Sequence, residues 1–156
     1  MIKMVIPGWG NTEIENMILD LNGTIATDGE IPLAVREKIN LLSEKVAIYI
    51  LTADTQGTAD EEGRGMNAKM IKIDQDGSKE KKLEFLKAHH PEKTVVLGNG
   101  NNDQLILKEA FLGIAVLGEE GISAAAIKNA DIIVKNISNA LDLFLKPKRL
   151  IATLRE

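Results

Sequence analysis

The 156-residue sequence contains no cysteine, so disulfides, thiolate metal sites and cysteine nucleophiles are excluded. Aromatic residues make up 3% of the chain, which argues against stacking platforms for single-stranded nucleic acid. No apolar run approaches the ~20 residues that a membrane-spanning helix needs. Charged residues make up 27% of the chain with a net charge of −4, and this balance indicates neither a nucleic acid nor a membrane partner.

Hydrophobic residues, by contrast, make up 44% of the chain, enough to bury a substantial core. Length and composition together predict one domain over residues 1–156. The N-terminal residues lack the sustained apolar stretch of a secretory signal peptide. We therefore expect a soluble, cytoplasmic protein, and the sequence leaves its oligomeric state open.

Short apolar runs bounded by glycine and proline alternate with amphipathic stretches along the chain. The apolar runs predict strands at Ile2–Ile6, Ile14–Leu21, Val46–Leu51, Met70–Ile73, Thr94–Leu97, Gly113–Leu117 and Ile132–Val134. The amphipathic stretches predict helices at Leu33–Glu44, Gly57–Glu62, Lys79–His89, Asp103–Phe111, Ile122–Asn129 and Ile137–Leu145. Ser78 is the expected N-cap of the third helix, and Pro147 is expected to interrupt the last helix before the tail 148–156.

This alternation predicts βαβ units and a mostly parallel sheet, because right-handed crossovers place helices on both of its faces. The expected fold is a Rossmann-like three-layer α/β/α sandwich. Ile2–Ile6 and Ile14–Leu19 are joined by a turn that contains glycine. We expect these two runs to form an N-terminal β-hairpin, with an antiparallel strand at one edge of the sheet.

Polar residues stand where several of these strands end. Asp20 and the residues up to Thr24 follow one strand, Thr52 and Ala53 follow the next, and residues 98–103 follow a third. Lys79 opens a helix between the last two. Ligands of open α/β sheets bind beyond the carboxyl ends of the strands, so we expect these side chains to converge in one crevice.

The convergent residue types suit phosphoryl transfer, which needs a nucleophile, a metal ion and neutralisation of phosphate charge. A carboxylate can act as the nucleophile, Mg²⁺ prefers oxygen ligands, and a lysine supplies a point charge. Each residue alone also has a structural explanation, as a turn former, a helix cap or a solvated surface cation. Their joint order along the chain favours the phosphate site.

That order resembles the haloacid dehalogenase superfamily of phosphatases, dehalogenases and P-type ATPase catalytic domains. More narrowly, it resembles the soluble, cap-less proteins related to P-type ATPases. The short segments between the first three motifs leave no room for a large cap domain. The matching residues are Asp20, Asn22, Gly23 and Thr24 in the first motif, Thr52 in the second, Lys79, Leu83 and Leu86 in the third, and Gly98, Asn99, Gly100, Asn101, Asn102 and Asp103 in the fourth.

The resemblance implies Asp20 as the nucleophile, with Asn22, Thr52 and Lys79 as its catalytic neighbours. Lys81 and Lys82 adjoin Lys79 and carry the same charge. The residues implied in phosphate binding are Gly23, Thr24, Thr52, Ala53, Lys79 and Asn102. The ligands implied for a Mg²⁺ cofactor are Asp20, the backbone carbonyl of Asn22, Asn99 and Asp103.

Two positions depart from the pattern of the phosphatases in this superfamily. Asn22 stands where they carry an acid–base aspartate, and an amide cannot exchange a proton at neutral pH. We therefore expect slow hydrolysis. Asn99 replaces an aspartate of the metal site, and the lost negative charge predicts weaker Mg²⁺ binding.

The sequence thus predicts a Mg²⁺-dependent phosphohydrolase that acts on a phosphate ester through an aspartyl-phosphate on Asp20. The alternative is a phosphate- or nucleotide-binding regulatory module with little or no turnover, which the two amide substitutions would suit. A third hypothesis is an assembly module in which the pocket has no function. The substrate cannot be predicted from the sequence.

Overall fold

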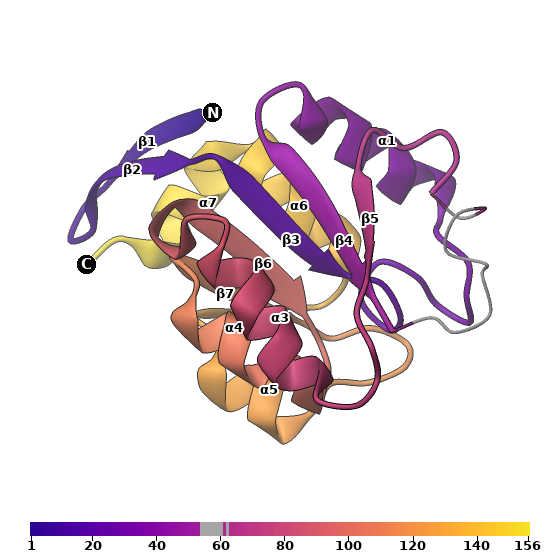
Figure 1. Ribbon diagram of the computed structural model, residues 1–156. Helices are drawn as coiled ribbons and strands as arrows, with labels where there is room; N and C mark the ends of the chain where they lie inside the picture. Colours follow the sequence, from indigo (N-terminus) through magenta and orange to yellow (C-terminus); the bar gives the residue numbers. More distant parts are fainter. Residues whose placement is uncertain (54–60, 62) are drawn as a thin grey trace.

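The computed structural model describes residues 1–53, 61 and 63–156. In this part of the chain, six parallel strands form one sheet in the order β5-β4-β3-β6-β7-β8 (Figure 1). The central position of β3 places its carboxyl end, at Asp20, between the ends of two neighbouring strands. The strands are β3 Asn16–Asp20, β4 Ala47–Thr52, β5 Lys69–Lys72, β6 Thr94–Gly98, β7 Leu112–Val116 and β8 Ile132–Val134.

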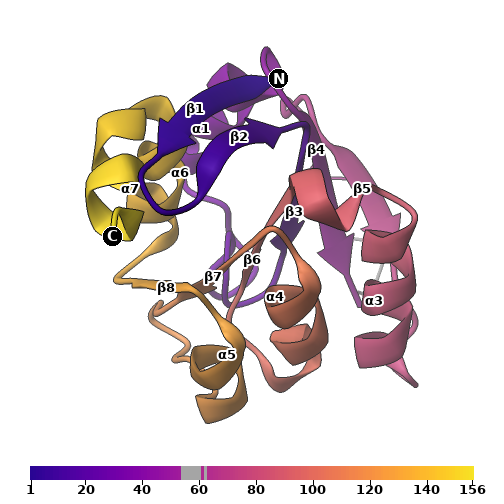
Figure 2. The same cartoon turned by 90° about the vertical axis from the view of Figure 1, so that its left-hand side faces the viewer.

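Helices cover both faces of this sheet, as Figures 1 and 2 show. On one face α1 (Leu33–Ser43) packs against α6 (Ile137–Leu145). On the other face lie α3 (Ser78–Lys87), α4 (Gln104–Glu109) and α5 (Ala124–Asn129). The predicted three-layer α/β/α sandwich is confirmed. The predicted helix Gly57–Glu62 falls largely outside the described residues.

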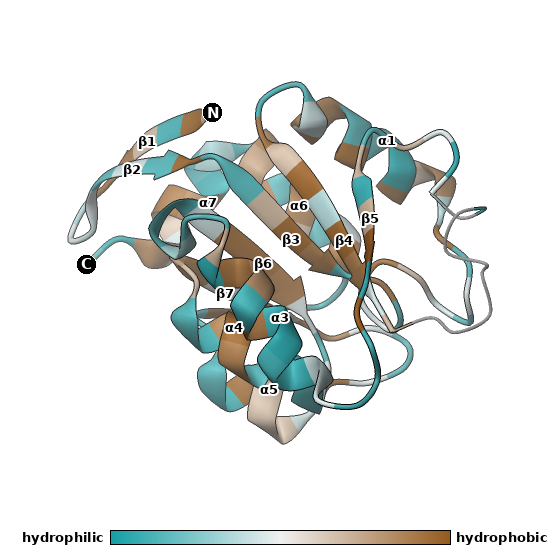
Figure 3. Cartoon of the chain, in the orientation of Figure 1, coloured by the Kyte–Doolittle hydropathy of each residue, from teal (hydrophilic) through white to brown (hydrophobic). Residues whose placement is uncertain are grey.

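Side chains of β3 point alternately into two apolar cores, one on each face of the sheet. Met17 and Leu19 join the core beneath α1 and α6, whereas Ile18 joins the core beneath α3, α4 and α5. Every residue of β6 and β7 is buried, and α1 and α4 carry both hydrophobic and hydrophilic residues along their length (Figure 3). Continuous burial of the central strands is what a parallel sheet between two helical layers requires.

The N-terminal hairpin is present, but its second strand differs from the prediction. Strand β1 (Ile2–Ile6) pairs antiparallel with β2 (Gly10–Ile14) in a separate two-stranded sheet, not at the edge of the main sheet. The apolar run that begins at Ile14 therefore contains two strands, which meet at Glu15. The buried Asn16 side chain fixes the start of β3, because its Nδ2 donates to the His89 carbonyl at 2.9 Å and to Thr94 Oγ1 at 3.3 Å.

Several helix boundaries also differ from the predictions. Gly77, with φ of 69°, is the N-cap of α3, so Ser78 is a helical residue and not the cap. The predicted helix from Asp103 begins as a 3-10 turn, η2 (Asn101–Asp103), before α4. The short 3-10 helix η1 spans Pro91–Lys93. Proline suits the first turn of a helix because its missing N–H would have no partner there.

The tail after Pro147 forms helix α7 (Pro147–Leu154), for which the sequence analysis assigned no element. Its Leu150 is buried in the same core as the hairpin residues Ile2, Met4 and Ile6. Beyond α7, the backbone N–H of Glu156 donates to the carbonyl of Pro7 at 3.2 Å. None of the helices in the described ranges combines the length and the apolar character that crossing a bilayer requires.

Candidate functional site

Asp20 is the last residue of β3 and lies at the carboxyl edge of the sheet. Its neighbour in the register of β4 is Leu51, and the N–H of Leu21 donates to the Leu51 carbonyl at 3.1 Å. After Asp20 the chain forms turns and two isolated bridges, Asn22 to Ala26 and Thr27 to Glu30, before α1 begins. We call residues 21–32 the flap. No inserted domain stands between β3 and α1.

Lys82 lies between two carboxylates at this edge. Its Nζ is 2.8 Å from Asp20 Oδ1 and 2.7 Å from Asp103 Oδ1. The exposed fraction is 1% for the Lys82 side chain, 12% for Asp20 and 0% for Asp103. A buried cation that contacts one carboxylate from β3 and one from η2 fixes all three side chains in position.

Lys79, which the sequence analysis placed in this site, lies elsewhere. Its side chain is 39% exposed, and its Nζ lies 3.8 Å from Glu80 Oε1. The prediction is therefore wrong by three residues, and Lys82 occupies the expected position. Lys82 stands four residues before the completely buried Leu86, so the two side chains share the face of α3 that meets the sheet.

Thr24 and Asn99 form the opposite side of the Asp20 carboxylate. Thr24 Oγ1 lies 3.3 Å from Asp20 Oδ2 and 3.1 Å from Asn99 Oδ1. The Asn99 amide Nδ2 donates to the carbonyl of Gly121 at 3.2 Å, which orients the amide so that its oxygen faces Thr24. Sequence reasoning missed Gly121, because its contribution is a backbone carbonyl that any residue type would carry.

Asp103 organises the loop after β6. Its Oδ2 accepts hydrogen bonds from the N–H groups of Asn99 and Gly100, each at 3.0 Å. A Cβ placed on Gly98 would lie 2.6 Å from the Asp103 carboxyl carbon, so the loop can close this tightly only around a glycine. The prediction that Asp103 ligates a metal ion stays a prediction, and its present contacts are to Lys82 and to this loop.

The other predicted residues surround this centre. Thr52 is buried at the end of β4, and Ala53 follows it with partial exposure. Asn102 is half-buried in η2, with its Oδ1 close to Gly100. Asn22 is exposed at the start of the flap. The roles assigned to these residues in binding and catalysis remain predictions, but their positions are compatible with one crevice.

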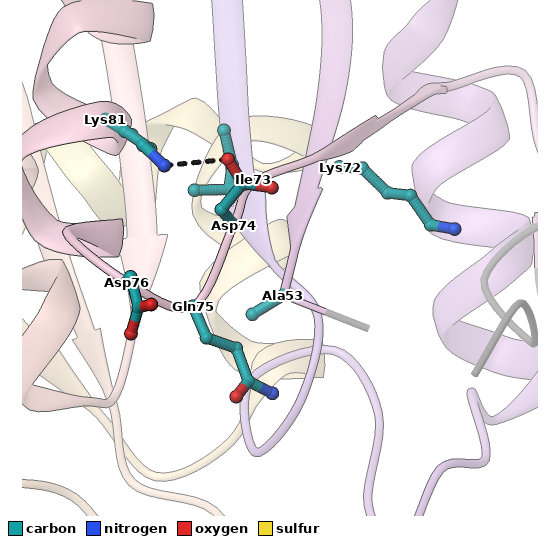
Figure 4. A pocket seen from close by; sticks show the side chains of 7 residues that line it. All are labelled: Ala53, Lys72, Ile73, Asp74, Gln75, Asp76 and Lys81. Atoms are coloured by element: carbon teal, nitrogen blue, oxygen red, sulfur yellow. Dashed lines mark hydrogen bonds and ion pairs between the residues drawn. The ribbon is translucent and has the colours of Figure 1, made fainter. Parts of the chain in front are cut away.

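A cavity of about 610 Å³ adjoins this centre (Figure 4). Its lining residues are Ala53, Lys72, Ile73, Asp74, Gln75, Asp76 and Lys81. Lys81 Nζ contacts Asp74 Oδ2 at 2.7 Å within it. The cavity lies beyond the carboxyl end of β5, beside the edge that carries Asp20, as expected for ligands of open α/β sheets.

The electrostatics of the centre favour protonation of Asp20 in the absence of a metal ion. Burial and the neighbouring Asp103 carboxylate raise the pKa of Asp20 to about 7, against the opposing effect of Lys82 and Thr24. Burial disfavours the charge on Lys82, but Asp20 and Asp103 outweigh it and raise the Lys82 pKa above its ordinary value. The cation is therefore retained across the physiological pH range, whereas the Asp20 carboxyl, with a pKa of about 7, titrates near neutrality.

The raised pKa of Asp20 predicts a pH-dependent difference in stability between the wild type and Asp20→Asn. The unfolded chain releases this proton near pH 4 and the folded chain near pH 7, so metal-free wild type loses stability between these values. Asp20→Asn lacks this loss. We expect the variant to be more stable at pH 8 by about 4 kcal/mol and similar to wild type at pH 4.

Urea unfolding with a chelator, at pH 4, 6 and 8, measures this difference. Because other groups titrate equally in both proteins, the subtraction isolates Asp20. A stability difference that is constant with pH would contradict the raised pKa. Added Mg²⁺ should narrow the gap at pH 8, since a ligand of the folded state stabilises it by mass action.

Gly23 allows the flap to approach Asn99. Its φ is +77°, and a Cβ placed on it would lie 2.4 Å from Asn99 Nδ2. Gly65 has the same φ of +77° with nothing within 4 Å, and it is therefore a matched control. We expect Gly65→Ala to cost about 1 kcal/mol of unfolding free energy and Gly23→Ala to cost about 2–3 kcal/mol. If urea unfolding shows that both variants lose the same free energy of unfolding, then the contact with Asn99 does not contribute to the cost at Gly23.

The donor set of the centre fits a divalent cation that prefers oxygen. The single hydroxyl proton of Thr24 cannot serve Asp20 Oδ2 and Asn99 Oδ1 at once, so these oxygens keep lone pairs for a cation. No group of three or more histidine or acidic side chains suited to a metal ion occurs among the described residues. A metal ion would therefore also need amide, backbone or water oxygens, as Mg²⁺ commonly does.

The fold and this site together define a class. Solved structures superpose on most of the chain. They include 3-deoxy-D-manno-octulosonate 8-phosphate phosphatase from Moraxella catarrhalis, in complex with magnesium, phosphate and the sugar, at a TM-score of 0.72 and 16% identity over 91% of this chain and 94% of that one. A hydrolase from Legionella pneumophila described under HAD superfamily subfamily III A gives a TM-score of 0.67 and 14% identity, over 90% and 87%. The chain has the haloacid dehalogenase fold.

A further structure is the cobalt-bound deoxy-D-mannose-octulosonate 8-phosphate phosphatase from Haemophilus influenzae. It gives a TM-score of 0.70 and 11% identity, over 88% of this chain and 90% of that one. At these identities the likeness establishes the fold alone. The activities of these proteins therefore bear on this chain only as support for a proposal.

Closer sequence relatives occur in Methanocaldococcus jannaschii. The uncharacterized protein MJ0073 is 51% identical over 80 residues, which cover 51% of this chain and 86% of that protein. The uncharacterized protein MJ0072 is 59% identical over 39 residues, which cover 25% and 89%. No family model matches the chain. The chain belongs to the family that includes MJ0073 and MJ0072.

Proposed function

We propose that this protein is a Mg²⁺-dependent phosphatase that transfers the phosphoryl group of a phosphate ester to Asp20. The observation that carries the proposal is the cluster of Asp20, Lys82 and Asp103 at the carboxyl edge of the sheet, with contacts of 2.8 and 2.7 Å. A buried lysine between two carboxylates leaves one net negative charge, which a divalent cation and a phosphate together would balance. Phosphatases among the proteins of the same fold support the assignment.

In the first step, an oxygen of the Asp20 carboxylate attacks phosphorus, and the bond from phosphorus to the leaving oxygen breaks. Lys82 is held beside the attacking carboxylate and would offset the negative charge that phosphate brings to the site. We assign the binding of phosphate oxygens to Thr52 and Asn102. The Asn22 side chain is exposed, and its amide supplies no proton, so the leaving oxygen takes one from water.

In the second step, water attacks phosphorus of the aspartyl-phosphate, releases inorganic phosphate and restores the Asp20 carboxylate. A general base normally accepts the proton of this water, and Asn22 cannot do so. We therefore expect the aspartyl-phosphate to form faster than it is hydrolysed. This property agrees with the resemblance of the motifs to those of soluble relatives of P-type ATPases.

Mg²⁺, when bound, would polarise the phosphoryl group and neutralise part of its charge. Asp20 Oδ2, Asn99 Oδ1 and the backbone carbonyl of Asn22 are the oxygens that we assign to it, with Asp103 as a further candidate. The Gly121 carbonyl would hold the Asn99 amide in the orientation that presents its oxygen. With an amide in place of one carboxylate, we expect modest affinity for the ion.

The proposal is tested by trapping the covalent intermediate. Wild type incubated with Mg²⁺ and acetyl phosphate should gain the mass of one phosphoryl group, and fragmentation after reduction of the acyl phosphate should place it on Asp20. Asp20→Asn should gain nothing. Beryllofluoride, which mimics an aspartyl-phosphate, should protect wild type from the label. Labelling of both proteins, or of neither, would refute the proposed function.

A regulatory module that binds phosphate without turnover is the second candidate. The amides at positions 22 and 99 favour it, since both replace expected acids. It predicts Mg²⁺-dependent phosphate binding by calorimetry in a protein that is never labelled on Asp20. The labelling experiment therefore separates the two candidates.

A further inference from the structure

Two residues that line the cavity, Ala53 and Lys81, are next in the chain to residues of the proposed catalytic centre. Ala53 follows Thr52 in the chain, and the N–H of Ile73 donates to the Thr52 carbonyl at 2.8 Å. Lys81 precedes Lys82, which contacts Asp20. A phosphoryl group held at Asp20 would therefore leave the rest of its ester within reach of this cavity.

The side chains that line the cavity are mainly hydrogen-bonding groups of both polarities. Lys72 and Lys81 donate, Asp74 and Asp76 accept, and Gln75 does both. Figure 4 shows Asp76 and Lys72 on opposite sides of Gln75, and it shows the pair of Lys81 with Asp74 above Gln75. Hydroxyl groups, which both donate and accept, match such a mixed lining better than a group of one charge.

Other substrate classes match the lining less well. Nucleobases bind proteins largely by stacking on aromatic rings, and the seven described lining residues include no aromatic side chain. Ala53 and Ile73 are the apolar members of the lining, so an aromatic or lipid ester would find little apolar surface. The volume of about 610 Å³ lies within the usual range for small-molecule sites, roughly 300–1,000 Å³.

We infer that this cavity binds the leaving group of the substrate, and that the leaving group is a sugar or polyol. The inference rests on the proposed function for the position of the phosphate. Gln75 and Asp76 are its main specificity residues. Their side chains are exposed and have no hydrogen-bond partner among the described residues, so they are available to hydroxyls.

Binding to the Asp20→Asn protein tests the inference independently of turnover. Calorimetry with Mg²⁺ would compare glucose 6-phosphate, sorbitol 6-phosphate, AMP, phenyl phosphate and inorganic phosphate. We expect the two sugar-type esters to bind at least about tenfold more tightly than the other three, as one or two added hydrogen bonds would give. Tightest binding of AMP or phenyl phosphate would overturn the inference, as would sugar esters that bind no better than inorganic phosphate.

Variants in the same background locate the specificity. Gln75→Ala and Asp76→Ala should each reduce the advantage of glucose 6-phosphate over inorganic phosphate about three- to tenfold. Glu109→Gln, an exposed change on α4, should leave that ratio as it is. An unchanged ratio in the two cavity variants would also overturn the inference. The outcome is distinct from that of Asp20 labelling, which reports on the chemistry and not on the leaving group.

Discussion

Lys82→Met should reduce the rate of Asp20 phosphorylation by about 10²–10³-fold, the usual effect of removing one preorganised charge at a reacting centre. The substitution leaves Asp20 and Asp103, both largely buried, without the cation that lies 2.8 and 2.7 Å from them. Mutual repulsion would then raise the pKa of the nucleophile further, and less of it would be ionised at neutral pH. Incoming phosphate would also meet uncompensated negative charge.

The matched control is Lys79→Met, which makes the same change three residues away on the same helix. Because the Lys79 side chain is 39% exposed and lies beside Glu80, we expect less than a twofold effect on labelling. Breaking the buried ion pairs of Lys82 should also lower the free energy of unfolding by about 3–5 kcal/mol. Protonation of Asp20 would restore part of this loss. Circular dichroism and Mg²⁺ binding establish whether the variant folds, and Lys82→Gln offers a milder change if it does not. A larger effect at Lys79 than at Lys82 would refute the site as described.

Asn22→Asp should accelerate breakdown of the aspartyl-phosphate by about 10²-fold, the lower end of the range for general acid–base catalysis. Asn22 is exposed at the start of the flap, two residues after the nucleophile, so an added carboxylate is hydrated and costs little stability. Steady-state hydrolysis should rise while the labelled fraction of Asp20 falls, because a formerly slow second step becomes fast.

Single-turnover measurements separate these effects. Labelled protein is separated from the substrate by gel filtration, and the loss of label from Asp20 is followed over time. Asp28→Asn, a change at an exposed position of the flap, serves as the control for altered charge in this region. If Asn22→Asp leaves the decay of the label unchanged, then position 22 is not where water is activated, and another feature must limit turnover.

Much of the site was predictable because the sheet orders it. Asp20 and Thr52 end two strands and the loop follows β6; these strands run in parallel, and topology alone brings their ends together. The strands themselves were predictable because β6 and β7 are continuously buried and carry uninterrupted apolar runs. A sequence pattern predicts burial well when the pattern is compatible with only one type of secondary structure.

The lysine was misassigned because periodicity left two faces of α3 equally plausible. Lys79 precedes Leu83 by four residues, and Lys82 precedes Leu86 by four; only the packing shows that Leu86 is the completely buried one. The hairpin was misassigned for a related reason. The break at Glu15 depends on hydrogen bonds from Asn16 to His89 and Thr94, which are distant in sequence. Contacts of this kind carry no local signature.

The packing of β1 against α7 has a consequence for folding during synthesis. The hairpin leaves the ribosome early, yet Ile2, Met4 and Ile6 reach their final partners only when Leu150 and its helix have been synthesised. Until then the apolar side of β1 is exposed and open to chaperones or to wrong partners. Folding of this region must therefore wait until α7 has been synthesised, while the central strands can assemble before it.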